Sequence, residues 1–265
     1  MMMIFNRLTL TTAALLAVST IASAQSYDDA YVTRDELPNG TIFLPAPPDT
    51  TDAAFFNDWL VYNRGLEKRP TPRGEQAQAD AEYSWSYIAK YYSKAMGFEI
   101  SPEKTPAIYR LLCRAANTGG DATYKPKKHY MRRRPFMVFN QHTMTPDHEP
   151  GLSRNGSYPS GHTSMGWATA LVLAEVNPAA QDSILLLGYE YGQSRTIVGA
   201  HWQSDVDAGR VTASAAVARM HCSPDFQADM AAAKAECDKI LGKSSVKGPN
   251  IMSKENAKRR HLRSK

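Results

Sequence analysis

Two residues four positions apart, His201 and Asp205, are of the types that nucleophilic catalysis uses. On a helix or in a tight turn, this spacing brings the Asp205 carboxylate within reach of Nδ1 of His201. The carboxylate would then fix the tautomer in which Nε2 keeps its lone pair and can attack an electrophile. Arg195 precedes them and adds a planar guanidinium suited to phosphoryl oxygens. For His201 and Asp205 taken alone, a structural His–Asp pair is an equally good interpretation.

A second segment, Pro159-Ser160-Gly161-His162, is typical of a helix that begins at Gly161. Free N–H groups and the positive end of the helix dipole at such a start favour an anion. Gly161 lets the backbone approach that anion closely, and the nearby His162 is suited to donating a proton to a leaving oxygen. Taken singly, Ser160 is better explained as a helix cap and His162 as a partly buried polar residue.

Two cations, Lys127 and Arg134, are seven residues apart in a third segment. On an α-helix this spacing is two turns, so a helix over 127–134, closed by Pro135, places both on one face. Two cations on one face predict a bound anion. Arg132 and Arg133 point elsewhere on that helix, and we expect them to be solvated or ion-paired.

Together the three segments resemble the pattern of the bacterial class A non-specific acid phosphatases. These belong to the superfamily that includes type 2 phosphatidic acid phosphatases and vanadium haloperoxidases. The likeness continues through the segments 155–158, 167–170 and 201–207, and it covers roughly residues 75–240. It implies a periplasmic enzyme that hydrolyses phosphate monoesters such as nucleotides, sugar phosphates and aryl phosphates, with an acidic optimum. It also implies phosphotransfer to alcohols, as in some relatives, and a homo-oligomer.

The resemblance and the chemistry of the residues together assign roles to eight positions. His201 is the nucleophile that becomes phosphohistidine, Asp205 orients it, and His162 is the proton donor. The phosphoryl oxygens are expected to be held by the side chains of Lys127, Arg134 and Arg195 and by the backbone amides of Ser160 and Gly161. No cluster with metal-ligand spacing accompanies them, so we expect no metal and no cofactor.

Two other functions remain open at this point. The same residues could hold vanadate in a haloperoxidase, because vanadate mimics the geometry of phosphoryl transfer. Alternatively, the protein could be a non-catalytic periplasmic protein that uses its cations to bind anions or nucleic acid.

The ends of the chain differ in composition from its body. Residues 1–24 combine an early Arg7, an apolar stretch and a small-residue ending, which predicts a secretory signal peptide. Residues 243–265 carry eight Lys or Arg against one acid, whereas 25–242 carry 22 against 25. The tail therefore accounts for the basic balance, and we expect it to be solvated and disordered. We expect neither a nucleic-acid partner nor a membrane association.

The fold class that the pattern predicts is all-α, a single multi-helix domain over 25–242 that resembles the helical fold of the haloperoxidases and acid phosphatases. Residues 25–50 are rich in Asp, Pro and Gly and are expected to be irregular. Alternation typical of strands is absent from the sequence. The predicted helices are 52–64, 75–96, 101–116, 127–134, 161–175, 181–198, 204–221 and 223–241.

Three cysteines in an exported chain predict one disulfide and one thiol. Cys222 and Cys237 would lie about 22 Å apart along a single helix, which is far too long for a bridge. Cys113 is therefore expected to pair with one of the two.

Overall fold

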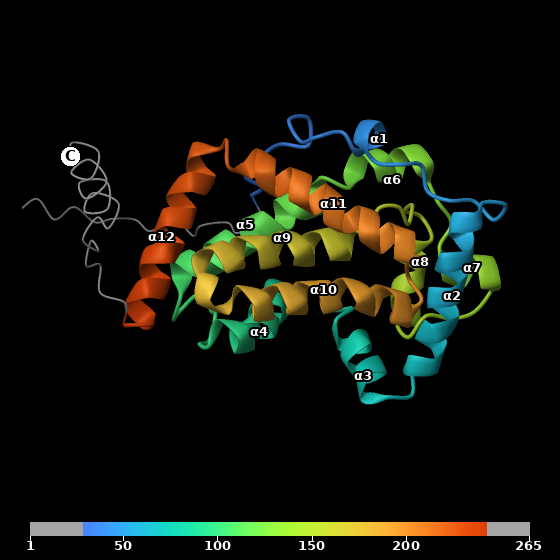
Figure 1. The fold of residues 1–265 in the computed structure, drawn as a ribbon, viewed down its shortest axis with the longest axis horizontal. Helices are drawn as coiled ribbons and strands as arrows, with labels where there is room; N and C mark the ends of the chain where they lie inside the picture. The colour runs from blue at the N-terminus through green and yellow to red at the C-terminus, as the bar shows by residue number, and fades with distance from the viewer. Residues whose placement is uncertain (1–28, 243–265) are drawn as a thin grey trace, which may run out of the picture.

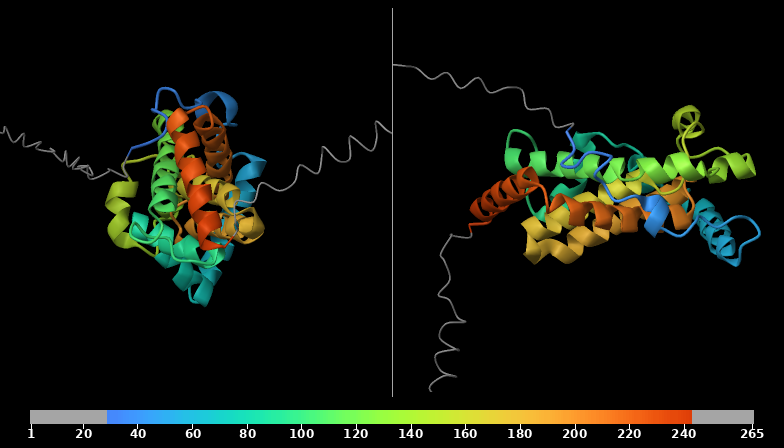
Figure 2. Two further views of the ribbon diagram at one scale, coloured as in Figure 1. Left: turned by 90° about the vertical axis from the view of Figure 1, so that its left-hand side faces the viewer. Right: turned by 90° about the horizontal axis from the view of Figure 1, so that it is seen from above.

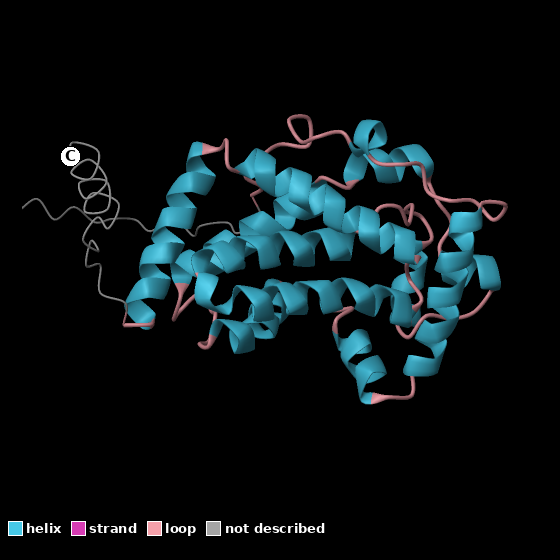
Figure 3. Cartoon of the chain, in the orientation of Figure 1, coloured by secondary structure: helices cyan, strands magenta, loops and turns pink. Residues whose placement is uncertain are grey.

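The computed structural model describes residues 29–242, and within this range every regular element is helical (Figures 1 and 3). The all-α prediction is therefore confirmed. The signal peptide over 1–24 and the basic tail over 243–265 lie outside the described residues, so both stay predictions. Among the described helices, none is long and apolar enough to span a membrane.

Three long helices form the centre of the bundle: α9 (Gly161–Val176), α10 (Gln181–Val198) and α11 (Gln203–Met220). Helix α9 packs against both of the others and against α5 (Pro106–Asp121). Small residues make this packing close, because a Cβ added at Gly166 would lie 2.3 Å from the Tyr191 ring. Figure 2 shows the same bundle from two other sides, with α12 (Pro224–Ile240) across one end.

The remaining elements are shorter and cover the bundle. At the end remote from α12, the beginnings of α9 and α11 meet the end of α10 (Figure 1). The covering α-helices are α1 (Gly40–Phe43), α2 (Ala53–Lys68), α3 (Pro72–Ala79), α4 (Trp85–Met96), α6 (Tyr124–Tyr130), α7 (Pro135–Phe139) and α8 (Glu149–Leu152). Short 3-10 turns occupy Pro146–His148 and Pro178–Ala180.

Several helix ends agree with the capping signals in the sequence. The side chains of Asp52, Ser160 and Ser223 accept backbone N–H groups at the starts of α2, α9 and α12. Gly97 ends α4 in the left-handed conformation, with φ 82°. Local capping chemistry therefore fixes these boundaries.

The predicted helix over 75–96 is wrong as a single element, because the chain breaks between α3 and α4. Asp80 ends α3 and is fully buried, where its carboxylate accepts hydrogen bonds from the hydroxyls of Ser194 and Tyr87. Ser84 then caps α4. Tertiary contacts to one carboxylate outweigh the helical propensity of this stretch.

Helix α5 also differs from its predicted range of 101–116. It begins at Pro106, after Thr105, and continues through Gly119 and Gly120 to Asp121. Gly119 stays helical because it packs directly on α9, where an added Cβ would lie 2.8 Å from Ser164 O. Both glycines therefore lie within α5, and Gly119 serves close helix packing.

The predicted helix over 127–134 is likewise wrong. Helix α6 ends at Tyr130, and Met131 adopts a left-handed φ of 41°. Pro135 begins α7 instead of closing a helix, as its fixed φ and missing N–H allow.

The disulfide predicted for Cys113 stays a prediction. Cys113 and Cys237 are fully buried on the packed helices α5 and α12, whereas Cys222 is exposed at the turn between α11 and α12. Cys222 precedes α12 and Cys237 lies near the other end of that helix, in keeping with the length argument against this pair.

Candidate active site

A cavity of about 740 Å³ lies at the end of the bundle where α9 begins. Its wall includes residues from α6, α9 and α10 and from the segment that joins α7 to α9. Six of the eight residues singled out in the sequence line it: Lys127, Arg134, Gly161, His162, Arg195 and His201. The other two, Ser160 and Asp205, lie behind the wall and are fully buried.

His201 is held in the tautomer that a nucleophile requires. Its Nδ1 lies 3.3 Å from Oδ2 of Asp205, and its ring is 2% exposed. A carboxylate only accepts, so Nδ1 carries the proton and Nε2 keeps its lone pair. Asp205 also accepts the Trp202 N–H at 2.9 Å, which fixes the carboxylate at the start of α11.

Arg134 contacts the other nitrogen of the same ring. Its Nη1 donates to Nε2 of His201 at 2.9 Å, and also to Ala200 O at 3.0 Å. Nε donates to Leu152 O at 2.9 Å, and Nη2 donates to Gly156 O at 3.3 Å. The guanidinium thus joins the nucleophile to the segment before α9.

Arg195 has two buried donors with no acceptor among the described residues. Its side chain is 1% exposed, and Nε and Nη1 make no hydrogen bond. Burial lowers the pKa of Arg195 to about 10, so the guanidinium still carries its charge at neutral pH. A buried cation with unsatisfied N–H groups costs free energy unless an anion binds beside it.

Lys127 is the third buried cation of the cavity. Its Nζ donates to Gly156 O at 3.0 Å. Burial, followed by the charge of Arg134, lowers its pKa to about 7. Lys127 and Arg134 therefore converge on one carbonyl and one cavity, although they do not share the helix predicted for them.

His162 is positioned by the break between α3 and α4. Its Nε2 lies 3.2 Å from Ala81 O, so Nε2 carries a proton and Nδ1 is the nitrogen left to exchange one. The ring stacks on Tyr191 with centroids 6.4 Å apart, and Tyr83 meets it edge-on at 5.4 Å. Burial, followed by the charge of Arg195, lowers the pKa of His162 well below its ordinary value.

The structure corrects the expected use of the Ser160 amide. That N–H already donates to Asp205 O at 2.9 Å, and Oγ accepts from Thr163 as the cap of α9. Only the hydroxyl proton of Ser160 remains for an anion. Gly161, in contrast, lines the cavity at the first position of α9.

Sequence reasoning missed three charged residues around this site. Arg132 donates to Asp205, and Asp58 in turn accepts from Arg132. Asp80 accepts from the hydroxyl of Ser194, the residue before Arg195. Arg132 was expected to be ion-paired or solvated, and it is ion-paired and nearly buried. No spacing rule relates Asp58 or Asp80 to the three segments, because they reach the site from α2 and α3.

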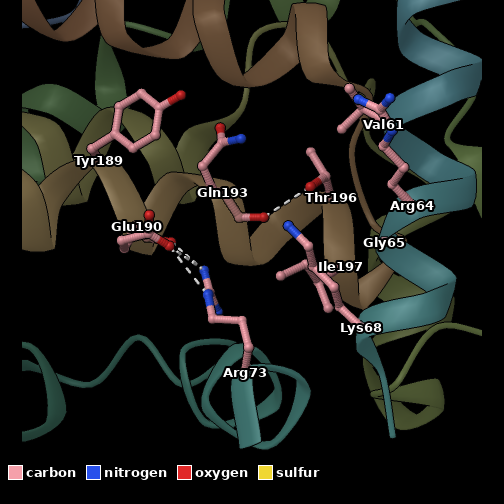
Figure 4. A pocket seen from close by; sticks show the side chains of 10 residues that line it. All are labelled: Val61, Arg64, Gly65, Lys68, Arg73, Tyr189, Glu190, Gln193, Thr196 and Ile197. Atoms are coloured by element: carbon pink, nitrogen blue, oxygen red, sulfur yellow. Dashed lines mark hydrogen bonds and ion pairs between the residues drawn. The ribbon is translucent and has the colours of Figure 1, made fainter. Parts of the chain in front are cut away.

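A second pocket, of about 300 Å³, lies between α2, α3 and α10 (Figure 4). It contains the ion pair between Arg73 and Glu190, 2.9 Å apart, and the exposed cations Arg64 and Lys68. None of the eight predicted site residues lines it. The larger cavity is therefore the candidate active site. Among the described residues, no group of three or more His, Cys, Asp or Glu is arranged to hold a metal ion.

Comparison with known proteins identifies the family to which the chain belongs. The PAP2 superfamily model matches residues 110–228, a range that contains all eight residues. A non-specific acid phosphatase of Providencia stuartii is 46% identical over 79% of this chain and 85% of its own. That of Salmonella typhimurium is 43% identical over 76% and 81%, and an acid phosphatase of Zymomonas mobilis is 35% identical over 75% of each. The chain belongs to the PAP2 superfamily and, within it, to the non-specific acid phosphatases.

Proposed function

We propose that the protein is an exported acid phosphatase that hydrolyses phosphate monoesters through a phosphohistidine at His201. One observation carries the proposal: the buried Nε and Nη1 of Arg195, in the cavity that His201 also lines, have no acceptor within residues 29–242. Two more cations, Lys127 and Arg134, line the same cavity. A phosphoryl group matches this site, because its negative charge pairs with the cations and its several oxygens accept from the several N–H donors.

In the first step, Nε2 of His201 attacks phosphorus, and the bond from phosphorus to the ester oxygen breaks. Nδ1 keeps its proton, which Asp205 accepts as a hydrogen bond from the imidazolium that forms. The leaving oxygen takes a proton from Nδ1 of His162. Positioning and charge neutralisation supply most of the acceleration in phosphoryl transfer.

In the second step, water attacks the phosphohistidine and gives a proton to His162. The new P–O bond replaces the bond to Nε2, which restores His201 and releases inorganic phosphate. An alcohol in the place of water gives phosphotransfer by the same route. Both reactions use His162 first as an acid and then as a base.

The remaining contacts hold the three equatorial oxygens. Arg195 and Arg134 offer guanidinium N–H groups, Lys127 offers its ammonium, and the start of α9 offers the Gly161 amide. The Ser160 hydroxyl offers its proton. The first four assignments follow from which donors line the cavity or lack an acceptor, whereas that of Ser160, which lies behind the wall, follows from the sequence pattern.

Turnover of p-nitrophenyl phosphate tests the proposal. We expect His201→Ala and His162→Ala to lose at least about 100-fold in kcat, because each removes a group that takes part in the chemistry. The matched control is His221→Ala, at the end of α11 and outside the cavity, which keeps full activity. Activity that survives in His201→Ala, or that disappears on chelation of metals, contradicts the proposal. Bromide oxidation with vanadate and peroxide, in place of ester hydrolysis, would identify a haloperoxidase.

Export and the role of the tail are tested separately. The predicted signal peptide places the start of the mature protein near Gln25, so N-terminal sequencing of protein from the periplasmic fraction should begin there. Deletion of 243–265 should leave turnover unchanged, because no site residue lies in the tail. Retention of residues 1–24 in a cytoplasmic protein contradicts the export proposal.

A further inference from the structure

The Asp205 carboxylate lies between the ring of His201 and the guanidinium of Arg132. Oδ2 faces Nδ1 of His201, at 3.3 Å, and Oδ1 accepts Nη1 of Arg132 at 2.7 Å. The carboxylate itself is 0% exposed. The group that orients the nucleophile is therefore itself paired with a cation that no sequence motif indicated.

Arg132 is in turn paired with a second buried carboxylate. Its Nη2 lies 2.7 Å from Oδ2 of Asp58, and the two side chains are 9% and 1% exposed. Asp58 also accepts the N–H and the hydroxyl of Ser204, at 2.7 and 2.6 Å. A continuous row of hydrogen-bonded charges thus runs from His201 on the cavity wall through Asp205 and Arg132 to Asp58 on α2.

The charges alternate along this row, and their sum sets the electrostatic potential at the ring of His201. Arg132 alone would cancel the charge of Asp205, which is the charge that stabilises the imidazolium formed on phosphorylation. Asp58 offsets Arg132 and leaves the row with one net negative charge. Interactions between buried charges are screened little by water, so each member of the row acts on the nucleophile.

We propose that Arg132 and Asp58 are positioning residues that set the negative charge behind His201, and thereby how far into acid the nucleophile stays unprotonated. This inference rests on the proposed function, because it assigns His201 as the nucleophile. Other charges also face these residues. From the cavity side His201 meets Lys127, Arg134, Arg195 and His162, and Tyr158 lies within electrostatic range of both Asp205 and Arg132.

Replacing Arg132 and replacing Asp58 should move the acid limb of the pH profile of kcat/KM in opposite directions. Arg132→Met leaves two uncompensated carboxylates, which favours protonated His201, so the limb should rise by about one pH unit. Asp58→Asn leaves a neutral Asp205–Arg132 pair, which disfavours protonated His201, so the limb should move to lower pH and kcat should fall at all pH values. A merely structural role predicts no such opposition.

Matched variants separate charge from packing. Arg132→Lys keeps the cation and should restore the wild-type limb even where kcat stays lowered. Ser204→Ala removes the hydroxyl that accepts from Arg132 and donates to Asp58, but it changes no charge and should leave the limb in place. Arg133→Met, on the next and exposed side chain, and Glu67→Gln, on the exposed side of α2, are controls expected to match the wild type.

The measurement is the pH dependence of kcat/KM for p-nitrophenyl phosphate, together with an NMR titration of histidines labelled with ¹⁵N in the ring. The His201 resonance should report the same opposite shifts without turnover. Should Arg132→Met fail to fold, the test is the comparison of Asp58→Asn with Ser204→Ala. The acid limb of the kcat/KM profile should shift in the first variant and stay in place in the second. An active wild type whose variants share one limb overturns this inference, whereas an inactive wild type overturns the proposed function instead.

Discussion

Nη1 of Arg134 lies 2.9 Å from Nε2 of His201, the atom proposed to attack phosphorus. Arginine only donates, so the lone pair of the nucleophile accepts a hydrogen bond while no ligand is bound. A phosphoryl oxygen that accepts Nη1 instead frees the lone pair at the moment when phosphorus is in place. Arg134 therefore occupies the lone pair of the nucleophile before the substrate binds and neutralises phosphoryl charge during the transfer.

The first prediction concerns this guanidinium. Arg134→Lys keeps the charge but loses the fork, so we expect kcat/KM to fall by about 100-fold. The carbonyls of Leu152 and Gly156 also lose donors, which should lower the free energy of unfolding by about 1–3 kcal/mol. Steady-state kinetics and urea denaturation measure the two effects. Arg133→Lys is the control, and equal behaviour of the two variants contradicts the assignment.

The second prediction separates function from stability at Arg195. Arg195→Met should weaken inhibition by inorganic phosphate by about 10- to 100-fold, because the variant loses charged hydrogen bonds to the anion. Its Tm should stay equal or rise, because the wild type buries N–H groups that find no acceptor in the described part of the chain. Inhibition kinetics and thermal unfolding test this pairing, with exposed Arg64→Met as the control. A variant that loses stability and keeps its phosphate affinity would show that Arg195 is structural.

The third prediction is an acidic pH profile. Burial lowers the pKa of His201, as do Arg134 and Lys127, so the nucleophile stays neutral further into acid than an ordinary histidine. Burial, followed by Arg195, also lowers the pKa of His162, so the proton donor loses its proton at lower pH. Both limbs of kcat/KM therefore move in the acidic direction, and the optimum should lie below pH 6.5, the ordinary histidine pKa. An optimum on the alkaline side of neutrality contradicts this assignment.

The fourth prediction is uptake of protons when phosphate binds. Because the pKa of Lys127 is lowered to about 7, most molecules of the free protein carry a neutral amine there at pH 8. An adjacent phosphate favours the ammonium and raises that pKa, so binding should draw protons from the buffer. Titration calorimetry in buffers of different ionisation enthalpy measures the number taken up. Lys127→Met should reduce it, whereas Lys90→Met, at an exposed position on α4, should not. Equal uptake in the two variants would assign the protons to other groups.

Local signals in the sequence predicted the long helices and the composition of the cavity. Ser160 and Gly161 predicted the start of α9, because capping and glycine chemistry act within one turn. The spacing of His201 and Asp205 predicted their hydrogen bond for the same reason. Lys127 and Arg134 reach one cavity as well, but through a left-handed Met131 that the helical spacing did not suggest.

What the sequence could not predict depends on contacts between distant segments. Asp80 breaks a stretch of good helix formers because Ser194, 114 positions away, donates to its carboxylate. Arg132 looked like one of three adjacent cations, yet ion pairs with Asp58, 74 positions earlier, and with Asp205 leave it nearly buried. Such pairs have no signature in spacing or composition, since only the fold brings them together.

Phosphate trapped on the protein tests the central claim most directly. Purified protein mixed with a ³²P-labelled monoester and quenched in alkali should carry a label that is stable to base and labile to acid. The label should be absent from His201→Ala and present in His221→Ala. A label that is stable to acid and lost in base would place the phosphoryl group on a hydroxyl such as that of Ser160. That result, or full labelling of His201→Ala, would contradict the account.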